Sequence, residues 1–104
     1  MKVVFHPEFP KDVRRFEHEY SEISEGLAWR FRLEIETAIA AIKVSPTSAG
    51  HFLSTGSEIV RDLRRKNLQA FPFFILYGVH GDRLMLGALI PSRSDPLTWL
   101  KRFR

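Results

Sequence analysis

The stretch from Phe71 to Ile90, FPFFILYGVHGDRLMLGALI, constrains the fold of this chain more than any other. Two apolar runs, residues 73–79 and 84–90, are separated by the polar step HGDR. Gly-Asp between two strand-like runs is typical of a β-hairpin with a two-residue turn. Both runs are apolar on both faces instead of alternating. We therefore expect them in the middle of a sheet, with helices on one face and a partly covered surface on the other.

Two helices are predicted before this hairpin. The first begins near Pro7, and its apolar face has spacings of 4, 3 and 4 residues: Phe9, Val13, Phe16 and Tyr20. The second begins after Ser24, a residue type that caps helix N-termini well, and ends at Ser45-Pro46. Its apolar stripe consists of Leu27, Phe31, Ile35, Ala38, Ile39 and Ile42. Because only a short joint separates the helices, we expect an antiparallel helical hairpin.

The strands complete an α+β fold. A short strand is predicted at residues 2–5 and another from residues 58–60 through to 68, with the Ser-, Thr- and Gly-rich stretch 46–57 as a loop. The predicted order is β-α-α-β-β-β. Three consecutive strands form an antiparallel meander, the first strand joins one edge, and the helical hairpin packs on one face. We expect residues 1–104 to form a single domain.

Positive charge is concentrated in the second half of the chain. Residues 1–52 contain 7 Lys/Arg and 8 Asp/Glu, whereas residues 53–104 contain 9 and 4. A basic sheet surface favours an acidic partner, such as a nucleic acid, a nucleic-acid-bound enzyme or an acidic peptide. The alternative is a surface whose charges serve only solubility.

Several functional classes lack the residues they need. There are no Cys, so disulfides and thiolate metal sites are excluded. The four His have no metal-like spacing, and there is no phosphate-binding Gly-rich loop and no nucleophile with a matching base. We therefore expect neither metal nor cofactor. No leader-like apolar region and no membrane-length apolar run is visible, which predicts a soluble, cytoplasmic protein.

The strongest candidate for a binding site is the basic segment EIVRDLRRKNL. Strand alternation puts Arg61 and Arg65 on one face and Arg64 on the other. The planar fork of arginine suits phosphates and acidic partners, but Asp62 could instead pair locally with a neighbouring arginine. Tyr77 lies in the middle of the hairpin, where tyrosine usually packs and a catalytic role is the less common alternative.

The tail SRSDPLTWLKRFR combines one Trp with several cations. We expect Leu97, Trp99 or Leu100 to cover the sheet. The basic side chains of the tail are expected to stay in water: Arg93, Lys101, Arg102 and Arg104. Their role is either binding or solubility.

Together these features resemble the RelE/ParE toxin superfamily. The match covers essentially the whole chain, from YSEISxxLAxxF in the helices to the segment after residue 63. The ParE pattern begins with an arginine, an F-P-aromatic step and I-x-Y. After a turn and an apolar strand it ends with R-x-x-P-x-x-W-x-x-R. The corresponding residues of this chain are Arg64, Phe71, Pro72, Phe73, Ile75, Tyr77, Arg93, Pro96, Trp99 and Arg102.

The resemblance implies the toxin of a type II toxin–antitoxin system, a growth inhibitor held inactive by a cognate antitoxin. ParE-like members act on DNA gyrase without catalytic residues of their own, whereas RelE-like members cut mRNA on the ribosome. Pro91 stands where the family often has His, and the tail has no Tyr or His. We therefore favour the ParE-like branch. A non-toxic binding module of the same fold is a third alternative.

The sequence is compatible both with an enzyme and with a protein that acts only by binding. If it cuts RNA, the candidate residues are Arg61, Arg64, Tyr77, Arg83 and Arg93, although no acid–base pair is evident. The candidate residues for binding a target or partner are Arg61, Arg64, Arg65, Arg93, Trp99, Lys101 and Arg102.

Overall fold

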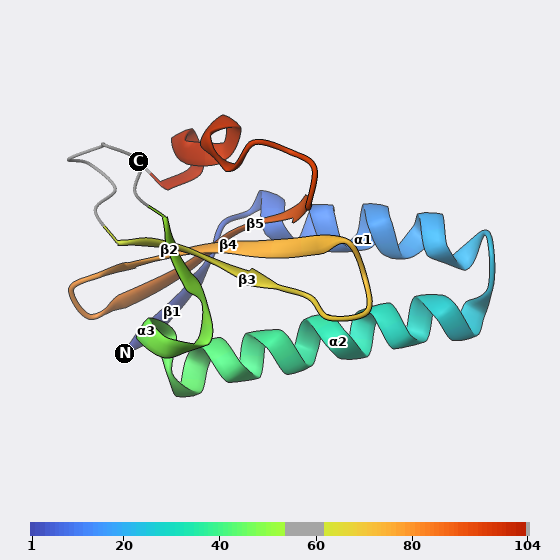
Figure 1. Ribbon diagram of the computed structural model, residues 1–104, viewed down its shortest axis with the longest axis horizontal. Coiled ribbons are helices and arrows are strands. Elements are labelled where there is room, and N and C mark those ends of the chain that lie inside the picture. Colours follow the sequence, from blue (N-terminus) through green and yellow to red (C-terminus); the bar gives the residue numbers. More distant parts are fainter. Residues whose placement is uncertain (54–61, 104) are drawn as a thin grey trace.

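The computed structural model describes residues 1–53 and 62–103 (Figure 1). The elements are β1 (Lys2–Phe5), α1 (Glu8–Ser21), α2 (Glu25–Val44), α3 (Pro46–Ala49), β2 (His51–Leu53), β3 (Leu63–Asn67), β4 (Phe73–His80), β5 (Arg83–Pro91) and the 3₁₀ helix η1 (Pro96–Phe103). The expected helices and meander are present. The loop predicted for residues 46–57 is wrong at α3 and β2, and the predicted strand start at residues 58–61 lies outside the described residues.

The strands form one sheet in the order β1-β5-β4-β3-β2. β1 lies at one edge, as expected, and runs parallel to β5, while the other neighbours are antiparallel. The β4–β5 turn has two residues between the strands, and its Gly81 adopts a φ of 58°, which glycine reaches without strain. The hairpin predicted from the apolar runs is confirmed.

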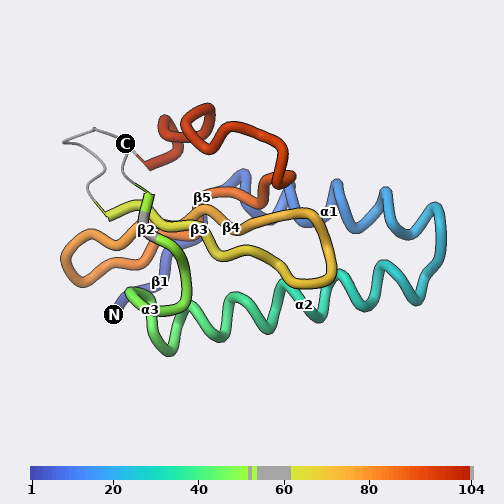
Figure 2. The backbone as a smooth tube through the Cα atoms, in the orientation of Figure 1, coloured from blue at the N-terminus to red at the C-terminus, as the bar shows by residue number. Residues whose placement is uncertain are grey.

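Helices cover both faces of this sheet. Figure 2 shows α2 on one side of the strands and η1 on the other. The helix-side core contains Phe31, Ile35 and Ile42 of α2 together with Phe73 and other side chains of the sheet. The opposite core contains Leu63, Phe74, Leu76, Ala88 and Ile90. The predicted burial on both faces is therefore confirmed, and the second face is covered by the chain's own tail.

Docking of η1 depends on small residues in the sheet. A β-bulge places Leu76 opposite Ala88 and Tyr77 opposite Leu86, so Gly87 has no partner in the register. The ring of Phe103 lies over Gly87 and Gly78, and a Cβ on Gly87 would overlap it. Trp99 and Leu100 pack beside Phe103 on the same core. In the part of the chain that the structure describes, no helix combines the length and apolarity needed to span a membrane.

Candidate functional site

The predicted site residues are divided between the two faces of the sheet. Arg64 pairs across the ladder with Tyr77, which belongs to the helix-side core. Arg65 lies on the opposite face, above Phe74, where Trp99 also packs. Arg83 begins β5 next to the turn and is exposed. Arg61 lies outside the described residues. The sequence therefore predicted one basic strand, but its arginines have different surroundings.

Arg64 joins β3 to α3. Its Nε donates to Asp62 Oδ1 at 2.8 Å, and its Nη1 donates to the backbone carbonyl of Thr47 at 2.8 Å. The side chain is only 17% exposed. The local pairing with Asp62, considered from the sequence, is therefore present. An arginine held by two partners contributes to positioning the α3–β2 segment.

Tyr77 has a similar structural contact. The residue is fully buried, and its hydroxyl donates to the carbonyl of Pro46 at 2.6 Å. Gly50 leaves room for this hydroxyl, because a Cβ there would lie 2.6 Å from it. Burial raises the pKa of Tyr77, against a smaller lowering effect of Arg64. The tyrosine thus fixes the start of α3 against the sheet.

The raised pKa of Tyr77 gives a testable pH dependence. The unfolded chain releases the phenol proton near pH 10, whereas the folded chain keeps it to higher pH. The stabilisation by Tyr77 is therefore complete below about pH 10 and declines as pH rises toward its folded pKa. We expect Tyr77→Phe to cost about 1–2 kcal/mol of unfolding free energy at pH 7, by leaving a carbonyl unpaired.

Urea unfolding of the parent chain and Tyr77→Phe should be compared between about pH 8 and pH 11. The difference between their unfolding free energies should narrow above about pH 10. Tyr20→Phe measures separately the contribution of the other tyrosine, whose pKa is also raised by burial. A difference that stays constant with pH would contradict the assigned burial of the Tyr77 hydroxyl.

Arg65 has a more open environment. Its guanidinium carbon lies 3.9 Å from the centroid of the Phe74 ring, and its Nε donates to Asn67 Oδ1 at 3.0 Å. His51 of β2 is its register partner, so the two side chains share one face at the edge of the sheet. The sequence did not indicate His51 as a site residue, because a histidine in a predicted loop cannot be assigned to a face.

The tail residues have three different environments. Arg93 and Lys101 are exposed, and Trp99 is half-buried on the sheet as expected. The prediction that Arg102 stays in water is wrong. Its Nη1 donates to Asp12 Oδ2 at 2.7 Å and to the carbonyl of Gly87 at 3.0 Å, and its side chain is 15% exposed. Arg102 therefore anchors η1. Arg104 lies outside the described residues.

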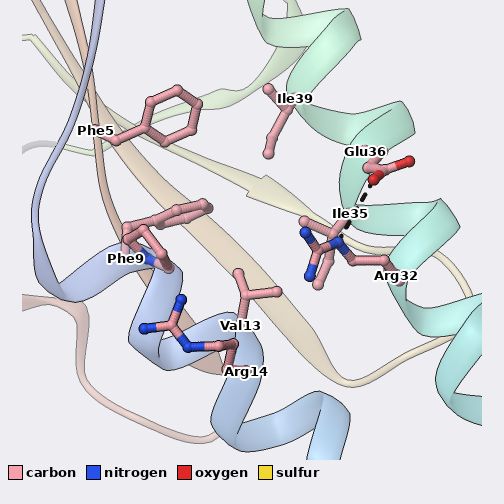
Figure 3. Close-up of a pocket in the computed structure, with 9 residues that line it drawn as sticks. Phe5, Phe9, Val13, Arg14, Arg32, Ile35, Glu36 and Ile39 are labelled. Carbon is pink, nitrogen blue, oxygen red and sulfur yellow. Dashed lines mark ion pairs between the residues drawn. The ribbon is translucent and has the colours of Figure 1, made fainter.

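A separate apolar groove lies between β1, α1 and α2 (Figure 3). It measures about 420 Å³, and its apolar wall includes Phe5, Phe9, Val13, Ile35 and Ile39. Arg14, Arg32 and Glu36 also line it, and Arg32 Nε lies 3.5 Å from Glu36 Oε1. Phe5 is 42% exposed. Among the described residues, no cluster of His, Asp or Glu could hold a metal ion.

Comparison with known proteins identifies the fold. No protein-family model and no curated protein matches this sequence. A chain in the solved structure of a chromosomal ParDE TA system from P. aeruginosa is similar, with a TM-score of 0.67. The similarity covers 88% of this chain and 95% of that one, at 19% sequence identity. The chain has a RelE/ParE-like fold.

The RelE/ParE-like fold agrees with the fold expected from the sequence pattern. The α+β class, the helical hairpin on one face and the antiparallel meander are all confirmed. At 19% identity this similarity concerns the fold alone.

Proposed function

We propose that this chain is the toxin of a type II toxin–antitoxin system, of the ParE-like kind that acts on DNA gyrase, and that a cognate antitoxin neutralises it. The observation that carries the proposal is the fold similarity to a chain of a ParDE TA system over 88% of this chain. The order of motifs in the sequence, from Arg64 to Arg102, supports the same branch.

The surroundings of the candidate catalytic groups favour the branch without its own chemistry. A general acid or base must reach the substrate proton directly or through one water. The hydroxyl of Tyr77 is buried against Pro46, and Arg64 is held by Asp62 and Thr47. These residues thus have structural partners, which is consistent with a toxin that acts by binding.

The groove beside Phe5 is our proposed docking site for the antitoxin. Its wall is apolar, and its edge carries the cation of Arg14 beside Arg32, which pairs with Glu17 and Glu36 of the same chain. An amphipathic segment with apolar residues on one side and carboxylates on the other matches that lining. The formal net charge of +4 favours an acidic partner as well.

The proposed target surface lies on the other face of the sheet, over η1 and the adjoining edge. Arg65, Arg93 and Lys101 supply exposed or partly exposed positive charge there, beside the half-buried Trp99. We include Arg61 in this surface on the sequence pattern alone. A face of this kind suits a complex of enzyme and DNA, because both the acidic protein surface and phosphate attract cations.

A supercoiling assay with purified gyrase tests the proposal. The chain should inhibit supercoiling or accumulate cleaved plasmid, and the double variant Arg65→Ala/Lys101→Ala should need at least about tenfold more protein for the same effect, a loss of about 1.4 kcal/mol. Lys11→Ala, an exposed cation on α1, is the matched control and should inhibit normally. Gyrase that is unaffected by excess protein would contradict the proposal.

One observation favours a second candidate, a RelE-like ribosome-dependent endoribonuclease. His51 and Arg65 are register partners, so an imidazole and a guanidinium share one face. Primer extension on translated mRNA would then show new cuts that disappear in His51→Gln and in Arg65→Ala. If no cuts appear, this alternative fails. Expression in a bacterial host without growth arrest would instead favour the third reading, a non-toxic binding module.

A further inference from the structure

The outer edge of β1 carries backbone groups that the sheet does not use. β1 is the last strand of the sheet on its side, so only one of its edges is paired. The N–H of Lys2 donates to the carbonyl of Asp82 at 2.7 Å, and that of His6 donates to a carbonyl of β5 at 2.9 Å. Alternate residues of a strand face alternate edges, so the N–H and C=O groups of Val3 and Phe5 point outward. In the described part of the chain, no group pairs with them.

This edge has few of the features that normally prevent pairing with another strand. Sheet edges are usually blunted by proline, a bulge or a covering segment. The sequence of β1 is KVVF, without proline, and its register with β5 is regular. The side chain of Val3 packs on the helix-side core, and that of Phe5 lines the groove beside Phe5. An open row of backbone donors and acceptors therefore adjoins an apolar groove.

The charges around this edge are mostly positive. Lys2 is exposed at the start of β1, and Arg14 lines the groove. The Nζ of Lys43 lies 6.0 Å from the centroid of the Phe5 ring. Among the described residues, no carboxylate forms an ion pair with these three cations, and Glu36, which lines the groove, is already paired within α2. An acidic segment complements this edge, whereas a second copy of the chain would add like charges.

We propose that an acidic segment of a protein partner binds this edge in extended form, as a further strand of the sheet next to β1. The inference rests on the proposed function, because it specifies how the antitoxin segment lies beside its groove. The N–H and C=O groups of Val3 and Phe5 form backbone hydrogen bonds with the segment. Apolar side chains on one face of the segment reach the groove. Carboxylates on its other face and at its ends lie near Lys2, Arg14 and Lys43.

The unpaired backbone groups favour a strand over a helix as the bound form. A helix satisfies its own backbone groups, so it would fill the groove and leave Val3 and Phe5 unpaired. An added strand uses these groups for affinity and its alternating side chains for specificity. β1 spans four residues, which corresponds to about 13 Å. An alternating segment of about six residues is therefore long enough to cover the whole edge.

A tethered probe tests this pairing in the full chain. The probe EVEFEVE is joined to the N-terminus through a flexible Gly/Ser linker of about ten residues, which gives a local concentration in the millimolar range. Amide hydrogen exchange, followed by NMR, should slow at least about tenfold at Val3 and Phe5 compared with the chain without a probe. Val4 is the internal control, because its N–H faces β5 in the same register and its exchange should not change.

Matched controls separate charge from backbone pairing. The tethered probe KVKFKVK keeps the apolar face and reverses the charges, so its protection of Phe5 should be at least about fivefold weaker. With the EVEFEVE probe, Val3→Pro removes an outward N–H without removing a bond to β5, whereas Val3→Ala keeps that N–H. Protection of Phe5 should fall at least about fivefold in Val3→Pro and less than about twofold in Val3→Ala. Thermal melting should show both variants folded.

Three results would overturn the proposal. One is unchanged exchange at Val3 and Phe5 with the EVEFEVE probe. Another is a change in the chemical shifts of Phe9 and Ile39 while that exchange stays fast, because the segment would then fill the groove without pairing. The third is slowing that rises with protein concentration in the chain without a probe, because a second copy would then cover the edge. Normal pairing in a chain that leaves gyrase unaffected would instead contradict the proposed function and leave the strand site intact.

Discussion

A Phe31→Asp chain is expected to show no cooperative unfolding transition. Phe31 is fully buried. The centroid of its ring lies 4.9 Å, 5.1 Å and 5.3 Å from the ring centroids of Tyr20, Phe71 and Phe73, respectively. Losing such a side chain costs about 3–5 kcal/mol, and burying an unpaired carboxylate costs several more. A domain of this size has about 5–15 kcal/mol of stability in total. The substitution therefore removes most or all of it.

Thermal unfolding followed by near- and far-UV circular dichroism measures this effect. Leu33→Asp is the matched control, because it places the same carboxylate two residues further along α2 at a position that is 43% exposed. It should lose about 1 kcal/mol or less and melt cooperatively. Leu89→Asp repeats the test in β5, where the parent residue is 2% exposed. A normal melt from Phe31→Asp would contradict the core assignment.

The features predicted correctly from the sequence are those encoded by nearby residues. The periodicity of the apolar residues indicated both helices. The side chain of Ser24 accepts a hydrogen bond from the N–H of Leu27, as expected of an N-cap, and α2 ends before Pro46. Gly81 supplies the turn of the hairpin. In each case the physical cause lies within a few positions of its effect.

The α3–β2 segment could not be predicted in this way. Its own sequence is rich in Ser, Thr and Gly, and its position depends on distant partners. Tyr77 binds the carbonyl of Pro46, and Arg64 binds that of Thr47, across 31 and 17 positions of sequence. Backbone carbonyls bound by remote side chains leave no trace in local composition. The face on which His51 lies was hidden for the same reason.

Glu34 provides a second example of a hidden long-range contact. Its carboxylate accepts hydrogen bonds from the backbone N–H groups of Gln69 and Ala70, at 2.9 and 3.0 Å. In the sequence it is one more charge on the polar face of a helix. In the structure it fixes the β3–β4 connection on α2 and lines a groove between α2 and the end of β3.

Asp12 holds three elements of the fold together. In the sequence it is only a carboxylate near the start of a helix, where negative charge suits the helix dipole. In the structure its Oδ2 accepts from the backbone N–H of Leu89 at 3.1 Å and from Arg102 Nη1 at 2.7 Å. The side chains of Asp12 and Arg102 are 17% and 15% exposed. One carboxylate thus joins α1, β5 and η1, although Leu89 and Arg102 lie 77 and 90 positions after Asp12 in the sequence.

Asp12→Ala is expected to lower the free energy of unfolding by about 3 kcal/mol, because it leaves a mostly buried guanidinium and a backbone N–H without their acceptor. Asp12→Asn keeps an oxygen for one donor and removes the charge, so its loss should be smaller. Glu8→Ala removes an exposed carboxylate whose ion pair with Lys11 spans 3.3 Å, and should cost about 1 kcal/mol or less. Chemical denaturation measures all three.

The fluorescence of Trp99 distinguishes loss of the anchor from general destabilisation. With Trp29→Phe as background, Trp99 is the only tryptophan, and it reports on whether η1 stays against the sheet. Asp12→Ala should shift its emission toward that of an exposed indole before the chain unfolds globally, because Arg102 no longer holds the tail. Glu8→Ala should leave the spectrum unchanged. If Asp12→Ala costs no more than Glu8→Ala and leaves Trp99 buried, the apolar contacts of Phe103 and Trp99 hold the tail without the ion pair.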